Sequence, residues 1–346
     1  MLVSVAQDYR VKMSSWNNCA PCKAALKTPR DVLGVLDKIL GYLIKENQLE
    51  AHRDKIGKIT DVLFDGFAPA WLSRNQKFDL SLTSEIKDSG LRFSYNNFDE
   101  KKGFQRKFLT VFRFFPNAFD LKALRLLFGY MGKTNDRHQT TIGCAWGQGE
   151  PVPRLKIYFE ELYHHYTQLE IREKWKHINA LMGIPSKHTC LLPYEKIGAL
   201  AIDFVPFRPC EMKIYYLRPH MDRDEAGVFV KAGGFGKKDR LFEAFTKKFL
   251  DGERSFFYLT HRLSHEGRPL SFKLYKIFEV AGDPCPDRPL AEIKDFFRLS
   301  RLGLLEERLA AVRAIAEKKR FCVYPVIIAC DKNRKRSRID LYLALK

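Results

Sequence analysis

Basic and tyrosine side chains stand two positions apart in several short segments of this chain. The pairs are Lys156 and Tyr158, Lys213 and Tyr215, and Lys273 and Tyr275. Residues i and i+2 of a β-strand share a face, so each lysine would lie beside its tyrosine, with the intervening Ile or Leu on the opposite face. One such segment would indicate an ordinary solvated strand, but three copies favour a shared site.

The chemistry that suits this pattern is the departure of a diphosphate from an allylic carbon. Several inward cations are costly unless they meet negative charge. A diphosphate, with several charges and many acceptor oxygens, matches converging Lys and Arg side chains. Neighbouring tyrosine faces would shield the resulting carbocation from water and stabilise it through cation–π attraction.

Hydrophobic periodicity indicates how these residues are positioned. Apolar residues have helical spacing over 30–48, and residues 78–86 alternate between apolar and polar, as in a strand. A turn at 88–90 leads into alternating residues 91–95, which completes a β-hairpin. A helix-like stretch follows at 119–131.

The same order recurs along the rest of the chain. Four further hairpins are predicted at 140–148 with 154–160, 200–206 with 211–217, 256–263 with 270–280, and 321–330 with 338–343. Helix-like stretches separate them at 161–182, 239–250 and 291–316. This internal repeat, with a period of roughly 55 to 70 residues, is longer than solenoid units.

Five hairpins joined by helices favour an α+β fold with one antiparallel sheet. Closure into a ten-stranded barrel would remove exposed edges and leave a solvent-filled lumen, with helices around the outside. Two separate five-stranded, sandwich-like sheets are the alternative. We expect a single domain over 1–346, with a helical part at 1–70 and the hairpin–helix repeats at 71–346.

The five hairpins and their Lys-x-Tyr strands resemble the ABBA prenyltransferases, which include indole and cyanobactin peptide prenyltransferases. The resemblance spans roughly residues 70–346. Two segments look closest to the peptide-modifying branch, LAIDFVPFRPCEMKIYYL at 200–217 and RIDLYLALK at 338–346. The segment KFDLSLTSEIKDSGLRFSYN at 77–96 is similar to the first hairpin of the indole enzymes.

The resemblance implies roles for individual residues. An acidic residue of the first strand corresponds to Asp79, and the arginine of the paired strand, which binds diphosphate, corresponds to Arg92. The later strands imply that Lys156, Lys213 and Lys273 bind diphosphate, and that Tyr158, Tyr215, Tyr275 and Tyr342 shield the cation. Arg338 is a further candidate for the diphosphate. Glu211 departs from the pattern of the indole enzymes, in which arginine is common.

The predicted reaction is transfer of a dimethylallyl or geranyl group from its diphosphate to an aromatic or peptide side-chain acceptor. Asp79 is the first candidate for orienting the acceptor or taking its proton, and Glu85, on the same strand face, is the second. No DDxxD magnesium motif is present. We therefore expect no obligatory cofactor, with magnesium at most stimulatory, no bound metal, and a monomeric enzyme.

Composition leaves two other functions open. The net charge of +19 and the 13% aromatic content fit an anionic partner, including nucleic acid, for which DKNRKRSR at 331–338 is the best patch. A non-catalytic carrier of prenyl diphosphate is the second alternative. We expect neither a nucleic-acid nor a membrane partner. The sequence has no long apolar run or signal peptide, and Cys19 and Cys22 lack further ligands for zinc, which fits a cytoplasmic protein with free thiols.

Overall fold

The structure is a computed structural model of the chain. It describes residues 29–64, 76–84, 90–97, 101–133, 139–160, 162–185, 196–218, 220–236, 239–250, 257–278, 287–321 and 323–345. The CxxC cysteines at 19 and 22 lie outside these ranges. Within them, no helix has the length and apolar character needed to cross a bilayer.

Within the described residues, a pair of helices followed by a β-hairpin occurs five times. The helices are α2 (Pro29–Glu46) and α3 (Arg53–Phe64) with the short η3 (Glu50–His52) between them, α4 (Lys101–Arg113) and α5 (Leu121–Lys133), α6 (Leu162–His165) and α7 (Gln168–Leu181), α8 (Arg223–Ala232) and α9 (Arg240–Phe249), and α10 (Asp287–Leu299) and α11 (Gly303–Glu317). The strands are β1 (Gln76–Thr83), β2 (Arg92–Asn97), β3 (Gln139–Ala145), β4 (Arg154–Glu160), β5 (Ile197–Phe204), β6 (Glu211–Arg218), β7 (Phe257–Leu263), β8 (Pro269–Ile277), β9 (Val323–Lys332) and β10 (Ser337–Leu345).

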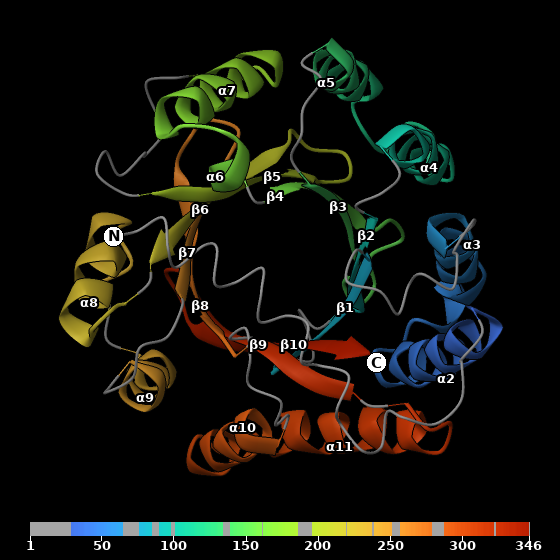
Figure 1. The fold of residues 1–346 in the computed structure, drawn as a ribbon, viewed down its shortest axis with the longest axis vertical. Helices are drawn as coiled ribbons and strands as arrows, with labels where there is room; N and C mark the ends of the chain where they lie inside the picture. The colour runs from blue at the N-terminus through green and yellow to red at the C-terminus, as the bar shows by residue number, and fades with distance from the viewer. Residues whose placement is uncertain are drawn as a thin grey trace.

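The ten strands form one closed antiparallel barrel, and the helices surround it (Figure 1). Each strand pairs with its neighbours in sequence, and β1 pairs with β10, with Leu80 opposite Leu343 and Thr83 opposite Asp340. This closure confirms the predicted α+β barrel and excludes the alternative of two separate sheets. It also pairs every strand on both edges, so no strand in the barrel is left with an open edge.

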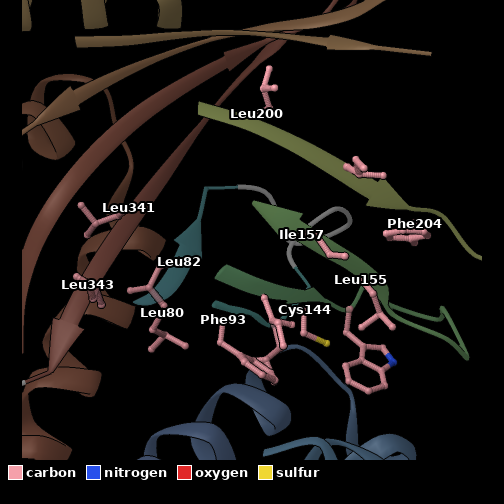
Figure 2. Packing of buried hydrophobic residues seen from close by; sticks show 14 of the residues in the cluster. Leu80, Leu82, Phe93, Cys144, Leu155, Ile157, Leu200, Phe204, Leu341 and Leu343 are labelled. Atoms are coloured by element: carbon pink, nitrogen blue, oxygen red, sulfur yellow. The ribbon is translucent and has the colours of Figure 1, made fainter. Parts of the chain in front are cut away.

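The strand sequences alternate because their two faces meet different surroundings. In β4, Leu155, Ile157 and Phe159 are buried on the outer face, whereas Lys156 and Tyr158 belong to the inner face. Figure 2 shows several outer-face side chains of β1 to β5 and β10 in the layer between strands and helices. Burying each such large apolar side chain stabilises the fold by roughly 1.5–3 kcal/mol.

Helices add the outer half of this core. Phe108 and Phe112 of α4 pack edge-on against Phe204 of β5, with ring centroids 6.1 and 5.1 Å away. Side-chain caps fix where some helices begin. Thr167 and Glu170 form a reciprocal capping box at the start of α7. The helix layer closes on itself where Arg308 of α11 donates to Asn47, just after α2, at 3.4 Å.

The helices come in pairs where the sequence analysis expected one helical stretch between hairpins. The predicted helix 291–316 is two helices, because Arg301 takes a left-handed φ of 57° and ends α10. Helix α3 lies within the helical part that was expected at 1–70, whereas α4 and α8 were not predicted. Helix α4 begins with basic and glycine residues that weaken the helical pattern.

Gly90, just before β2, generates a test of the fold. A β-carbon there would overlap the backbone carbonyl of Trp146, at the end of β3. We expect Gly90→Ala to cost about 1–3 kcal/mol of unfolding free energy, because Trp146 N–H donates to the Leu91 carbonyl at 2.8 Å and holds the two backbones together. Urea unfolding would measure the loss. The control is Gly129→Ala in α5, where no atom beyond the neighbouring residues and the helix's own backbone lies within 4 Å of the new β-carbon. A helical alanine there should stabilise by roughly 0.5–1 kcal/mol.

Candidate active site

The barrel encloses a cavity of about 240 Å³ that reaches the hairpin turns. Its lining includes Gln148 of the β3–β4 turn and Asn333 of the β9–β10 turn. The inner faces follow a common order from the turns inward. In β4 this order is Arg154, Lys156 and Tyr158, and the other second strands of the later hairpins likewise place a charged side chain before a tyrosine. The cavity is therefore charged near the turns and aromatic further in.

All five basic residues predicted to bind diphosphate line this cavity. They are Arg92, Lys156, Lys213, Lys273 and Arg338. The strand register explains their convergence, since Lys156 lies opposite Asp203, and Lys273 lies opposite Asp331. Arg154 and Arg262 line the same cavity and were missed by the sequence analysis.

Asp203 of β5 holds two of these lysines. Its carboxylate lies 2.9 Å from Lys213 Nζ and 3.6 Å from Lys156 Nζ, and the residue is 1% exposed. Burial favours the neutral acid, but the two lysines and Arg262 outweigh it and hold the pKa of Asp203 well below its ordinary value. Burial lowers the pKa of Lys156, and repulsion from Lys213 and Arg92 lowers it further. Attraction to Asp203 raises this pKa but offsets the decrease only in part.

Asp340 of β10 gathers a second group of cations. Its carboxylate contacts Lys273 Nζ, lies 3.2 Å from Arg92 Nη1, and lies 3.5 Å from Arg338 Nε. Arg338 also donates to Asp331 at 2.8 Å. Burial opposes ionisation, but Lys273, Arg338 and Arg92 hold the pKa of Asp340 well below its ordinary value. Asp340 is 0% exposed, so it is an ionised group inside the barrel wall.

Glu211 connects the two remaining arginines of the cavity. Its carboxylate lies 3.6 Å from both Arg154 and Arg262. This position is the one where the sequence departs from the indole enzymes, and the structure shows that the glutamate neutralises neighbouring arginines. Among the described residues, the cavity lining holds seven cationic side chains and the carboxylates of Asp203, Asp331 and Glu150, the last of which accepts from the Gly147 backbone. Two further carboxylates, Asp340 and Glu211, contact these cations. With every one of these groups ionised, their charges sum to +2.

The four predicted shield tyrosines form one cluster beyond the cations. Ring centroids are 6.2 Å apart for Tyr158 and Tyr215, 5.8 Å for Tyr215 and Tyr275, and 6.0 Å for Tyr275 and Tyr342. Tyr258 of β7 also packs on this cluster and was not predicted. Burial raises the pKa of the phenols of Tyr158, Tyr215 and Tyr275 well above the ordinary value, which keeps these rings neutral.

Small residues beside the tyrosines leave room in the barrel. Tyr158 lies opposite Ala201 and Thr141 in the register, and Tyr215 lies opposite Ala199. A β-carbon at Gly143 would come within 3.0 Å of the Tyr158 ring, so glycine allows that ring to lie over β3. A shell of rings around small neighbours can enclose an apolar group without filling the lumen.

Lysine 273 joins the charged and aromatic parts of the site. Its ammonium lies 4.9 and 5.1 Å from the ring centroids of Tyr275 and Tyr342, and it donates to the Tyr342 hydroxyl at 2.7 Å. The rings that face this ammonium are therefore positioned to stabilise positive charge at the boundary between the two layers.

Of the two acidic candidates in the first hairpin, the structure describes the backbone of Asp79 alone. Asp79 belongs to β1, where it lies opposite Ser94 and Ala344, and the structure does not describe its side chain. Glu85 lies outside the described residues. Arg92 lies opposite Ser81 across the hairpin, and its guanidinium lies 3.2 Å from the Asp340 carboxylate.

No group of three or more potential metal ligands occurs among the described residues. The described cysteines Cys144, Cys210 and Cys330 are free and buried, and burial raises the pKa of the Cys210 thiol to about 12. These thiols are therefore protonated at neutral pH.

Comparisons with known proteins identify the fold. No protein-family model matches the sequence, and no curated protein sequence matches it. The solved structure of 5-dimethylallyltryptophan synthase from Streptomyces coelicolor is similar, with a TM-score of 0.60 at 15% identity, over 89% of this chain and 96% of that one.

Two further structures with this fold contain bound ligands. A ternary complex of the prenyltransferase PriB with L-tryptophan and dimethylallyl thiolodiphosphate has a TM-score of 0.59 at 15% identity, over 93% of this chain and 96% of that one. A 6-dimethylallyltryptophan synthase from Micromonospora olivasterospora, in complex with DMASPP and Trp, has a TM-score of 0.56 at 14% identity, over 90% and 96%. The chain therefore has the barrel fold of prenyltransferases.

The ionised aspartates predict how stability depends on pH. The pKa of Asp203 and that of Asp340 are lowered on folding, so their stabilisation is present above the unfolded value of 3.8 and is lost as the pH falls below it. Each should contribute a slope of about 1.4 kcal/mol per pH unit in that range. Urea unfolding between pH 2.5 and 5 should show a shallower slope for Asp340→Asn. An unchanged slope would mean that Asp340 is not ionised in the folded barrel.

Proposed function

We propose that this protein is a prenyltransferase that moves a dimethylallyl or geranyl group from its diphosphate to an aromatic or peptide side-chain acceptor. The observation that carries the proposal is the order of side chains within one cavity, with cations nearer the hairpin turns and a cluster of tyrosines beyond them. A prenyl diphosphate has the matching order, because its anionic head is joined directly to an apolar chain.

In this proposal the cations bind the diphosphate and stabilise the charge that develops as it leaves. Arg92, Lys156, Lys213, Lys273 and Arg338 are the diphosphate-binding residues, since all five line the cavity. Preorganised charge of this kind is commonly the largest contribution to catalysis. The reacting carbon would then lie at the boundary where Lys273 meets the tyrosine rings.

Tyr158, Tyr215, Tyr275 and Tyr342 shield the allylic cation in this mechanism. Their faces would exclude water that would otherwise capture the cation, and would stabilise it through cation–π attraction. Keeping the phenols neutral is important here, because a phenolate would itself be alkylated. The raised pKa of three of these tyrosines supports the role.

The acceptor proton needs a separate group. Asp203, Asp331 and Asp340 are ion-paired, and the pKa of each is lowered, which makes them weak bases. We therefore propose Asp79 as the residue that orients the acceptor or takes its proton, with Glu85 as the second candidate. Asp79 stands two positions before Ser81, which lines the cavity, and alternate residues of a strand share a face.

The proposal includes no obligatory metal, because lysine and arginine side chains supply the positive charge at the diphosphate. It also includes catalysis by a monomer, since one barrel contributes the whole described site. A non-catalytic carrier of prenyl diphosphate would use the same cavity. Turnover separates the carrier from the enzyme.

The direct test is incubation with labelled dimethylallyl or geranyl diphosphate and aromatic acceptors, including tryptophan and tyrosine- or tryptophan-containing peptides. We expect a prenylated product and release of diphosphate, both with magnesium and with EDTA. Binding of donor without any product would favour the carrier. Loss of activity in EDTA that magnesium restores would contradict the metal-independent mechanism.

Lys213→Ala tests the diphosphate site. Removing a charge-assisted contact worth about 1.5–3 kcal/mol should weaken donor binding roughly 10- to 100-fold. The matched control is Lys247→Ala, an exposed lysine of α9 outside the cavity lining. Equal donor affinity in both variants, measured by titration calorimetry, would remove Lys213 from the site.

Asp79→Asn tests the acceptor side. If Asp79 takes or orients the proton, turnover at saturating donor should fall roughly 10²- to 10⁴-fold while the donor still binds. A structural residue would instead lose unfolding free energy or donor affinity and keep near-normal turnover. Glu85→Gln, measured alongside, shows which carboxylate has the role.

A further inference from the structure

Two buried aspartates hold the cations of the cavity from opposite walls. Asp203 is on β5 and Asp340 is on β10, and these strands are five positions apart in the ring of ten. Asp203 is 1% exposed and Asp340 is 0% exposed. Together they contact Lys156, Lys213, Lys273, Arg92 and Arg338, which are the five residues proposed to bind diphosphate.

These contacts provide counter-ions for buried cations when no anion is bound. A buried cation without a counter-ion is strongly destabilising, so a cavity built only of lysine and arginine would fold poorly without its ligand. From the sequence alone, we expected a bound polyanion to supply that compensation. In the structure, Asp203 and Asp340 supply it from the barrel wall itself.

The same carboxylates also limit the attraction for an anion. The seven cations that line the described cavity are accompanied by three carboxylates of the lining and by Asp340 and Glu211, which contact the same cations. With every group ionised, the net charge that acts on the anion is two instead of seven. A diphosphate released by the reaction has to leave before the next donor enters. A cavity without internal counter-ions would hold that product far more tightly.

We propose that Asp203 and Asp340 are resident counter-ions. They are positioning residues that hold the diphosphate-binding cations in place, and they lower the affinity of the cavity for diphosphate enough for product release. This inference rests on the proposed function, since it concerns the same anion site. It assigns no contact between either aspartate and substrate.

A solely structural role makes the opposite prediction. If the aspartates only fix the cations, removing one leaves its lysines and arginines disordered, and diphosphate binds more weakly. If they are counter-ions, removing one leaves more uncompensated positive charge, and diphosphate binds more tightly. The direction of the change in affinity therefore separates the two roles.

The experiment measures the affinity of inorganic pyrophosphate for the whole chain and for Asp340→Asn and Asp203→Asn. A unit charge acting over roughly 6–10 Å at an effective dielectric constant near 20 corresponds to about 10- to 100-fold tighter binding in each variant. In turnover, each variant should show a lower kcat with a lower KM, and a burst of prenylated product before slow steady-state release. Weaker or unchanged pyrophosphate binding in both variants would overturn the inference.

Asp295→Asn is the matched control. Asp295 of α10 also pairs with two cations, Lys248 at 2.5 Å and Arg298 at 2.9 Å, but it lies in the helix layer outside the cavity lining. Its loss should leave pyrophosphate affinity unchanged. Tighter binding in this variant as well would show that net charge alone, and not the cavity aspartates, controls affinity.

A folding defect in either aspartate variant provides a second test. If an aspartate variant does not fold alone, added pyrophosphate should restore its fold, because the ligand replaces the missing counter-ion. Failure of pyrophosphate to restore either variant would overturn the inference. Absence of pyrophosphate binding to the wild-type chain would overturn the proposed function too, whereas wild-type binding without tightening in the variants overturns only this inference.

Discussion

The organisation of this protein depends on the alternation of side chains along strands that close into a ring. Every strand has one face toward the helices and one toward the lumen, so each must carry two unlike sets of residues. In β4 the outer set is Leu155, Ile157 and Phe159, and the inner set begins with Lys156 and Tyr158. The pairing of β1 with β10 closes the ring, so the inner faces of all ten strands line one lumen and the outer faces lie outside it.

The outer and inner faces contribute differently to the free energy. The outer face gains stability from apolar burial against paired helices, as Phe204 does against α4. The inner face carries groups whose burial opposes folding, and these are tolerated because carboxylates such as Asp340 compensate the cations around them. The helix layer therefore supplies the stability that lets the lumen hold a charged site.

The sequence predicts the parts of this structure that repeat locally. The alternation of apolar and polar residues predicted the strand bounds to within a few residues, and the Lys-x-Tyr spacing predicted that lysines and tyrosines share one face. The helices were harder to predict, because α10 and α11 form a continuous apolar pattern whose break depends on the single left-handed residue Arg301. Asp203 was missed because its strand is buried throughout, so no polar face stands out there. One signal was present: an isolated aspartate in an apolar strand requires a cationic partner.

The partnership of Asp340 shows why pattern alone could not locate the charge balance of the site. Asp340 occupies the position in its strand where three other strands carry a lysine. The repeat alone would therefore suggest that this residue binds the anion, although its charge is negative. Its partners Arg92 and Lys273 come from β2 and β8 and meet it only in the closed ring. Local sequence thus specifies which residues face the lumen, whereas ring closure determines which charges meet there. Anion binding in this barrel therefore depends on these non-local pairs, because the anion responds to the summed charge of all the groups together.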